Sequence, residues 1–506
     1  MSPAKMSVVV CAKLSQAKQF VRFRAEGGTQ LQCIVVIESI EQADIDAARE
    51  ENVDLISFED MVVCWIVDYA LQPPSPEDVC TVCYTSGTTG DPKGVVLTHE
   101  SVLSNVAAVM KQTFSKNFGP EDVHISYLPL AHMFERICQV IMFHCGARVG
   151  FFRGDVKLLL DDIQELKPTY FPTVPRLLNR IYNKVMTRVK ESRAKSMLFN
   201  FALNRKMALL KSGVISRDTL WDKLVFRRVQ QSLGGRVKFI ISGSAPLSSV
   251  VHEWLRCVFG CAVLEGYGQT EYSAGVSFNL PHEYRTGHVG PVLPCALLKV
   301  VSVPEMDYFA EQGRGEVCVK GPSRMKEYFL NPEKTRETID EDGWLHTGDI
   351  GRINENGTLS IIDRKKHHFK LFAGEYITPE RIEGVYSRSS FVLQVFLDGD
   401  SSQRFPVAIV VPDPEVVLTW VMHHGIAETG IAQLCKSEVL KKAILDDIRR
   451  LAVEAGLKGF EQVQDIHLHP EPFSVDNGLL TPTLKNKRIV LRRFFSEQMK
   501  NLYNNN

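Results

Sequence analysis

Short apolar runs alternate with polar, helix-like stretches along the first part of the chain. Residues 8–11 and 33–37 are apolar, and the acid-rich stretch 41–53 that follows them is typical of a helix. This order predicts a βαβ fragment within residues 1–70. After a proline-rich linker, strand-like and helix-like segments continue to alternate to about residue 300, which predicts an α/β architecture.

The pattern changes after residue 300. Residues 300–362 contain short β-like runs, such as 316–320 and 359–363, which are separated by Gly and Pro. A charged tetrapeptide, 363–366, precedes a smaller region of mixed α and β character. We therefore expect a large α/β domain in residues 1–363 and a small α+β domain in residues 364–506.

Composition and charge narrow the possible functions. A chain of 506 residues is long enough for more than one domain. Its 59 Lys and Arg residues balance its 59 Asp and Glu residues, which gives no indication of nucleic-acid binding. The apolar stretch 137–152 contains His144 and Arg148 and is not expected to span a membrane.

The cysteines indicate a reducing compartment. Twelve cysteines occur without a repeating spacing, which is typical of free thiols and not of a disulfide framework. The close pair Cys80 and Cys83 lies in a β-like run, where residues three apart face opposite sides of a strand. We interpret both as buried structural thiols.

The strongest chemical signal is the segment 84–94, which reads Y-T-S-G-T-T-G-D-P-K-G. Its glycines allow a ligand to approach the backbone closely, and its hydroxyls and backbone N–H groups can donate to phosphate oxygens. Lys93 adds a positive charge. The segment is not a Walker A loop, because Pro92 precedes the lysine and no Ser or Thr follows it. It predicts a phosphate-binding turn, with a plain hairpin turn as the alternative.

This loop resembles that of the adenylate-forming superfamily, which includes acyl-CoA synthetases, luciferases and peptide-synthetase adenylation domains. Further motifs of the superfamily follow in the same order along the chain. They are 127–132 (Y-L-P-L-A-H), 242–247 (S-G-S-A-P-L), 265–271 (E-G-Y-G-Q-T-E), 343–349 (G-W-L-H-T-G-D), 363–366 (D-R-K-K) and 374–377 (G-E-Y-I). The segments 175–180 (P-R-L-L-N-R) and 477–485 (N-G-L-L-T-P-T-L-K) look like those of eukaryotic long-chain fatty-acid–CoA ligases.

The resemblance implies a fold and a reaction. The fold is a large multi-subdomain domain, 1–363, followed by a small mobile lid, 364–506, with a hinge near 363–370 that includes Lys366. The reaction is ATP-dependent activation of a long-chain fatty acid to an acyl-adenylate, followed by thioester formation with coenzyme A. Because a carboxylate is a poor electrophile, such an enzyme must stabilise a charged phosphoryl transition state by position and charge.

The resemblance also implies which residues bind ATP. Those residues are Thr85, Ser86, Gly87, Thr88, Thr89, Gly90 and Lys93 for the β- and γ-phosphates, Gly243, Ser244, Ala245, Tyr267 and Gly268 around the adenine, and Asp349 and Arg364 for the ribose hydroxyls. A carboxylate suits paired O–H donors.

The catalytic residues implied by the resemblance are few. Thr270 would contact the α-phosphate, and Glu271 would bind Mg²⁺, which prefers oxygen ligands. Lys485 would lie against both the substrate carboxylate and the α-phosphate, with Lys487 as the alternative lysine. His132 would border the acyl and coenzyme A region as a gate.

Residues 176–211 contain ten basic residues and one acid. Arg176, Arg180, Lys184 and Arg188 recur every four residues, which places them on one stripe of a helix. Two interpretations stay open. The stripe is either a solvated face or a surface for anionic lipid or coenzyme A phosphates, and contact with lipid would be peripheral.

Only 83 residues precede Tyr84, whereas the ligases that this chain resembles have a larger front portion with a membrane anchor. We therefore expect the anchor and much of the first subdomain to be missing. The resemblance implies the cytosolic face of the endoplasmic reticulum or the mitochondrial outer membrane, or the cytoplasm for a chain without an anchor. Two alternative functions are an adenylation domain that serves a carrier protein and a non-catalytic nucleotide or lipid binder. The sequence indicates neither acyl chain length nor oligomeric state.

Overall fold

The computed structural model describes residues 6–63, 72–85, 92–114, 118–365, 369–372, 375–399, 402–424, 430–481 and 484–504. The chain divides into two compact units, Met1–Pro74 and Ser75–Asn506. The division falls within the proline-rich linker. Each unit has its own hydrophobic core.

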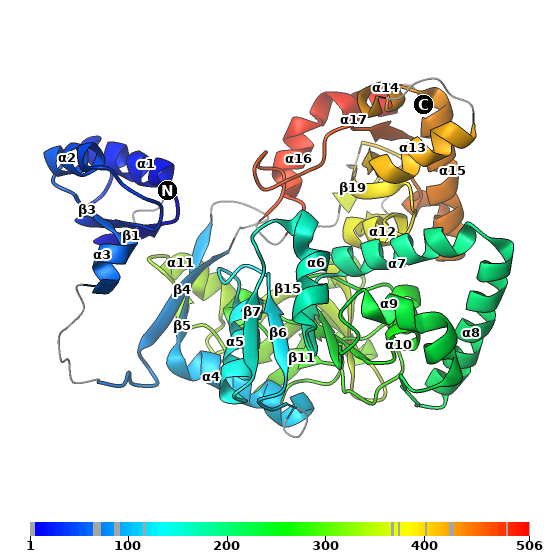
Figure 1. The fold of residues 1–506 in the computed structure, drawn as a ribbon, viewed down its shortest axis with the longest axis horizontal. Coiled ribbons are helices and arrows are strands. Elements are labelled where there is room, and N and C mark those ends of the chain that lie inside the picture. The colour runs from blue at the N-terminus through cyan, green and yellow to red at the C-terminus, as the bar shows by residue number, and fades with distance from the viewer. Residues whose placement is uncertain are drawn as a thin grey trace. The chain divides into compact units, whose positions relative to one another are not determined.

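The first unit is a small parallel sheet with helices between its strands (Figure 1, blue). Its elements are β1 (Val8–Cys11), α1 (Leu14–Ala25), β2 (Cys33–Val36), α2 (Gln42–Glu50), β3 (Asp54–Ser57) and α3 (Phe58–Val63). Strand β2 lies between β1 and β3 and is parallel to both. Ile34 and Val36 of this central strand are buried. The βαβ prediction is confirmed.

The second unit is built on a six-stranded sheet of order β11-β10-β9-β8-β6-β7. Its strands are β6 (Val123–Ser126), β7 (Arg148–Phe151), β8 (Tyr170–Thr173), β9 (Phe239–Ser242), β10 (Ala262–Tyr267) and β11 (Ser277–Phe278). All pairings are parallel except that of β10 with β11. Every residue of β8 and β9 is buried, as expected for parallel strands that are covered on both faces.

Helices surround this sheet and continue the α/β alternation (Figure 1). They are α4 (His99–Val109), α5 (Met133–His144), α6 (Leu159–Leu166), α7 (Pro175–Lys190), α8 (Arg193–Lys211), the π-helical turn η3 (Asp222–Phe226), α9 (Arg227–Gln231) and α10 (Ser249–Phe259). Helix α7 begins with a proline at its first position, where the missing N–H costs nothing. The α/β fold class is confirmed.

Two antiparallel sheets complete the large lobe. One contains β12 (Leu297–Val301), β13 (Arg314–Lys320), β15 (Leu345–Ile353) and β16 (Leu359–Arg364). The other contains β14 (Glu327–Tyr328), β5 (Lys93–Thr98) and β4 (Val79–Thr85), and α11 (Pro332–Thr338) connects β14 to β15. The β-like runs predicted at 316–320 and 359–363 are confirmed as parts of β13 and β16.

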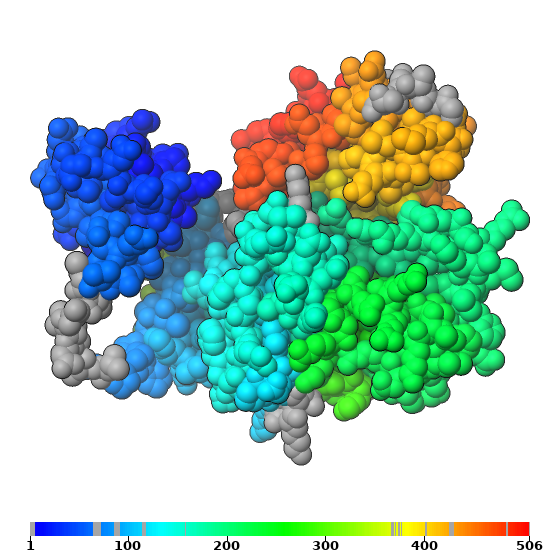
Figure 2. All heavy atoms as spheres, viewed as in Figure 1, coloured from blue at the N-terminus to red at the C-terminus, as the bar shows by residue number. Residues whose placement is uncertain are grey.

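The small lobe follows β16. Its strands are β17 (Phe369–Lys370), β18 (Tyr376–Ile377), β19 (Val392–Asp398), β20 (Val407–Pro412) and β21 (Ile466–Leu468). Its helices are α12 (Pro379–Tyr386), α13 (Pro414–His423), α14 (Ile431–Leu434), α15 (Glu438–Glu454), α16 (Arg488–Phe494) and α17 (Ser496–Asn504). Two hydrophobic clusters here consist wholly of residues after 368. Figure 2 shows this lobe, yellow to red, against the cyan and green surface of the large lobe. The domain boundary at 363 stays a prediction.

Several thiols are buried among these elements. The described cysteines are free, and Cys138, Cys257, Cys261 and Cys318 are buried. Burial raises the pKa of Cys257, Cys261 and Cys318 to about 12.

The expectation for the close cysteine pair is half wrong. Cys83 is buried, but Cys80 is exposed, because the two residues point to opposite faces of β4 and only one face is covered. Among the described residues, no helix is long and apolar enough to cross a bilayer.

Candidate active site

The candidate site lies where β9 and β10 end, which is the usual place for a ligand in a parallel sheet. The loop after β9 contains Gly243, Ser244 and Ala245, and Ser244 has a positive φ of 73°. The backbone N–H of Leu247 closes the loop by donating to Oε1 of Glu265 over 2.8 Å. The loop is therefore anchored to the strand beside it.

The end of β10 is tightly packed. At Gly268 a Cβ would lie 1.4 Å from the carbonyl oxygen of Ala274, so no larger residue fits there. The neighbouring Tyr267 donates from its hydroxyl to Oδ2 of Asp349 over 2.8 Å. Glycine at 268 thus allows the turn that directs Tyr267 toward Asp349.

Asp349 and Arg364 face each other on paired strands. They are register partners in β15 and β16, and Nε of Arg364 lies 2.8 Å from Oδ1 of Asp349. The charge of Asp349 raises the pKa of Arg364, and Nε of Arg364 also lies 3.8 Å from Glu380. Both oxygens of Asp349 are hydrogen-bonded, yet a carboxylate has about four acceptor sites and can still accept ribose hydroxyls.

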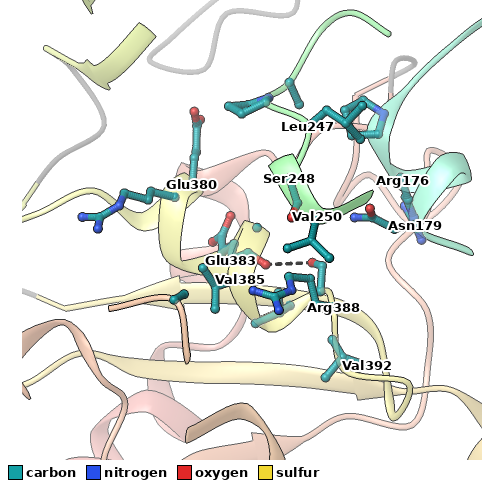
Figure 3. A pocket seen from close by; sticks show the side chains of 18 of the residues that line it. Arg176, Asn179, Leu247, Ser248, Val250, Glu380, Glu383, Val385, Arg388 and Val392 are labelled. Carbon is teal, nitrogen blue, oxygen red and sulfur yellow. Dashed lines mark hydrogen bonds between the residues drawn. The ribbon is translucent and has the colours of Figure 1, made fainter. Parts of the chain in front are cut away.

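These residues line a cavity of about 1960 Å³ between the two lobes. From the large lobe it is lined by Ser244, Ala245, Tyr267, Gly268, Asp349 and Arg364, and from the small lobe by Glu380, Arg388 and Lys485 among others. Figure 3 shows Arg176 and Asn179 of α7 across the cavity from Glu383 and Arg388. The cavity contains seven of the sequence-predicted site residues, which are far apart along the chain.

Lys485 reaches this cavity from a tight turn. Its N–H donates to Oγ1 of Thr481 over 3.1 Å, and Leu484 before it has a positive φ of 61°. Burial and the charge of Arg364 lower the pKa of Lys485 to about 8, although the carboxylates of Glu380 and Asp349 oppose this effect. The charges of the predicted ribose-binding pair, Asp349 and Arg364, therefore influence the pKa of Lys485.

The alternative lysine lies in a different environment. Lys487 precedes α16 and its N–H donates to the carbonyl oxygen of Leu479. It is not among the described residues that line the cavity. The geometry favours Lys485 over Lys487.

A second group of predicted residues lies outside the lining of this cavity. Thr85 and Lys93 are register partners at the loop end of the β4–β5 hairpin, and Nζ of Lys93 lies 5.1 Å from the ring centroid of Tyr328. The hydroxyl of Tyr328 donates to Oε1 of Glu271 over 2.7 Å. The hairpin that carries the phosphate loop is thus connected to the predicted metal ligand through one tyrosine.

The remaining predicted residues are partly outside the described ranges and partly within them. Ser86, Gly87, Thr88, Thr89 and Gly90 of the phosphate loop lie outside the described residues, as does Lys366 of the hinge. Thr270 begins the 3₁₀ turn Thr270–Tyr272 that also contains Glu271. Gly243 is buried directly after β9.

Glu271 is the predicted metal ligand, and its surroundings suit Mg²⁺ with a nucleotide. Among the described residues, no group of three His, Cys, Asp or Glu side chains could hold a metal ion. Mg²⁺ is commonly held by one or two carboxylates together with substrate phosphates and water. A single carboxylate, connected through Tyr328 to the hairpin that carries the predicted phosphate loop, fits that arrangement.

His132 occupies the N-cap position of α5. Its Nε2 is buried and has no hydrogen-bond partner among the described residues. Burial and the charge of Lys485 lower the pKa of His132 to about 4, so the imidazole is neutral at neutral pH. His132 thus lies near enough to Lys485 to be influenced by its charge, which suits a residue at the border of the site.

Sequence reasoning missed three residues that shape the site. Tyr328 contacts Glu271 from a two-residue strand that gives no motif signal. Glu380 approaches Arg364 from α12, across the lobe boundary. Glu265 supports the loop after β9, a role that its place in the 265–271 motif does not indicate, and burial raises its pKa to about 7.

Comparison with known proteins agrees with this geometry. Residues 1–329 match the model of the AMP-binding enzyme family. The chain is 48% identical over 504 residues to long-chain-fatty-acid–CoA ligase 5 of Mus musculus, which covers 99% of this chain and 73% of that protein. It is 52% identical over 433 residues to long-chain-fatty-acid–CoA ligase 1 of Homo sapiens, which covers 85% of this chain and 62% of that protein.

Solved structures show the same fold. The adenylation domain of the carboxylic acid reductase from Segniliparus rugosus, in complex with AMP and a co-purified carboxylic acid, matches with a TM-score of 0.78 at 23% identity. The match covers 98% of this chain and 75% of that one. The corresponding domain from Mycobacterium chelonae matches with a TM-score of 0.75 at 25% identity, over 98% of this chain and 73% of that one.

These matches and the cavity residues agree on one assignment. The chain belongs to the AMP-binding enzyme family and, within it, to the long-chain-fatty-acid–CoA ligases.

Proposed function

We propose that this chain uses ATP to activate a long-chain fatty acid as an acyl-adenylate and transfers the acyl group to coenzyme A. The products are acyl-CoA, AMP and pyrophosphate. The observation that carries the proposal is the meeting of Lys485 with Tyr267, Asp349 and Arg364 in one cavity. Its relatives are long-chain-fatty-acid–CoA ligases.

The large lobe binds and orients ATP. Asp349 and Arg364 hold the ribose hydroxyls, and Ser244, Ala245 and Tyr267 surround the adenine. Thr85 and Lys93 mark the two ends of the loop that receives the β- and γ-phosphates. The anchored loop after β9 and the Tyr267–Asp349 hydrogen bond keep these groups in place before ATP arrives.

Glu271 and Lys485 act on the reacting groups. Mg²⁺, when bound, neutralises phosphate charge, and Glu271 supplies its carboxylate ligand while Thr270 contacts the α-phosphate. Lys485 places a positive charge between two anions that must approach each other, the fatty-acid carboxylate and the α-phosphate. The positive charge lowers the cost of that approach and stabilises the transition state.

Coenzyme A binds with its phosphates against α7. Arg176, Arg180, Lys184 and Arg188 all line the cavity between the lobes, which supports the coenzyme A interpretation of this stripe. Basic side chains suit the phosphates of coenzyme A. His132 borders the site and admits the thiol or the acyl chain.

The reaction takes place at the cytosolic face of the endoplasmic reticulum or of the mitochondrial outer membrane. Contact with the membrane is peripheral and uses part of the basic segment 176–211. A long-chain fatty acid partitions into bilayers, so an enzyme at the membrane surface has direct access to its substrate.

Two assays test the proposal. Fatty-acid-dependent exchange of labelled pyrophosphate into ATP measures adenylation, and release of acyl-CoA measures thiol transfer. We expect both activities. Exchange without acyl-CoA release would support an adenylation domain that serves a carrier protein. Binding of ATP with neither activity would support a non-catalytic binder.

A further inference from the structure

The basic segment 176–211 consists of two helices with different surroundings. The stripe on α7 faces the cavity between the lobes. Helix α8 follows it and contributes no residue to the cavity lining. Any membrane contact by this segment must therefore come from α8 and its neighbours.

The orientation of α8 is fixed by its inner face. Phe199, Ala202 and Leu210 are buried. Lys206 is also buried and lies 2.7 Å from Asp222 of η3, with exposed side-chain fractions of 3% and 2%. An ion pair without access to water holds α8 firmly against η3, because separating the charges is costly.

The outer face of the same helix is apolar along its centre. Met197 is 74% exposed and Phe201 is 49% exposed, and they lie four residues apart on one side of α8. Beside them, Leu220 is 61% exposed and Leu224 of η3 is 68% exposed. The Trp221 ring packs edge-on to Phe201 with centroids 5.3 Å apart, which joins the two groups.

Positive charges border these apolar side chains. Arg193, Arg205 and Lys211 are exposed on α8, and Lys223 is exposed on η3. The guanidinium carbon of Arg205 lies 5.3 Å from the centroid of the Phe201 ring. Helix α8 contains no Asp or Glu, and the nearest acids in sequence are Glu191 and Asp218.

This combination identifies the partner by its chemistry. Exposed large apolar side chains surrounded by cations match the headgroup region of an anionic bilayer, where the apolar groups insert and the cations meet lipid phosphates. A second copy of the chain would bring like charges together on the same face, which disfavours self-association.

We propose that α8 and η3 form a membrane-docking surface, in which Met197, Phe201 and Leu224 insert into an anionic bilayer and Arg193, Arg205 and Lys211 contact its headgroups. This inference rests on the proposed function, because a long-chain fatty acid gives the enzyme a reason to meet a bilayer. Docking through α8 leaves α7 and the cavity available for the soluble substrates.

The test is sedimentation with vesicles of phosphatidylcholine alone or mixed with phosphatidylserine. We expect the full chain to bind the mixed vesicles and to bind far more weakly to phosphatidylcholine alone. A variant with Met197→Ser, Phe201→Ser and Leu224→Ser should bind the mixed vesicles about tenfold more weakly. A variant with Arg193→Gln, Arg205→Gln and Lys211→Gln should lose the preference for phosphatidylserine.

The matched control carries Met422→Ser, Val439→Ser and Val453→Ser, which remove apolar side chains of the small lobe that are at least 61% exposed. It should bind vesicles like the unmodified chain. Equal vesicle binding by the α8 variant and this control would overturn the proposal, as would dimer formation that the α8 substitutions abolish. Pyrophosphate exchange with a long-chain fatty acid supplied on albumin, without vesicles, should be unchanged in every variant, which verifies folding. Absence of that exchange in the unmodified chain would count against the proposed function and not against docking.

Discussion

The two lobes contribute to the cavity in different ways. On the large lobe, Tyr267, Asp349 and Arg364 are joined by direct hydrogen bonds and an ion pair. On the small lobe, Lys485 projects from a turn, and burial together with Arg364 disfavours its charged form. Under the proposed function, this difference predicts that nucleotide binding depends on a preorganised set of groups, whereas adenylation depends on the position of the small lobe.

Removal of the small-lobe charge should have the largest effect. Lys485→Ala should lower pyrophosphate exchange by about a hundredfold to a thousandfold, because it removes a positive charge that acts on the transition state. ATP binding, measured by calorimetry, should change little. Transfer to coenzyme A from supplied acyl-adenylate should fall much less.

Lys487→Ala is the matched control for Lys485→Ala, since it removes a lysine two residues away outside the cavity lining. It should retain nearly full exchange activity. Equal losses in adenylation and thiol transfer for Lys485→Ala would contradict the role given to this lysine.

Substitution of the hydrogen-bonded residues of the large lobe should affect ATP binding directly, unlike Lys485→Ala. Asp349→Asn removes the negative charge that pairs with Arg364 and accepts the hydrogen bond of Tyr267. This substitution should weaken ATP binding by about tenfold to a hundredfold. Calorimetry with ATP measures this loss. Glu380→Gln, at 3.8 Å from Nε of Arg364, should have a smaller effect. If the two variants weakened ATP binding equally, the ribose-binding role of Asp349 would be wrong.

The contributions of the two lobes should also differ in pH dependence, because pyrophosphate exchange should depend on pH and ATP affinity should not. The pKa of Lys485 is lowered to about 8, so its ammonium is present below that pH and is lost as the pH rises through it. Above this value pyrophosphate exchange should fall by about tenfold per pH unit, as expected for one essential proton. ATP affinity should stay level, since the pKa of Arg364 is raised.

Lys485→Arg provides the control for this pH profile, because arginine stays charged throughout this range. Whatever exchange activity it retains should not fall between neutral and moderately alkaline pH. A fall identical to that of the unmodified chain would assign the ionisation to another group.

The smallest effect should come from the basic stripe on α7. Arg180→Gln with Lys184→Gln should raise the KM for coenzyme A about fivefold, because each exposed charge contributes little alone. Pyrophosphate exchange should be unaffected. Arg193→Gln with Lys195→Gln removes the same charge from α8, outside the cavity lining, and should leave this KM unchanged. Equal KM values in the two variants would reject the role of α7.

Much of the fold and part of the site could be predicted from the sequence. The ordered motifs of the adenylate-forming superfamily implied several of the residues that line one cavity, among them Gly268 and Asp349. The periodicity of α7 identified its basic stripe but could not distinguish it from the basic residues of α8. The difference arises because α7 lines the same cavity as small-lobe residues such as Arg388, which are far from it in the sequence.

Contacts between strands that are distant in the sequence could not be predicted for the same reason. The Tyr328–Glu271 hydrogen bond depends on the pairing of β14 with β5, which is set by tertiary structure and not by propensity. The exposure of Cys80 likewise depends on which face of β4 is covered.

The buried cysteines have a consequence for an enzyme that handles a thiol substrate. Disulfide exchange proceeds through the thiolate. Burial raises the pKa of Cys257, Cys261 and Cys318 to about 12, so very little thiolate forms on them at neutral pH. These three side chains therefore react slowly with the disulfide of oxidised coenzyme A. Burial of these three thiols therefore disfavours mixed disulfides with coenzyme A.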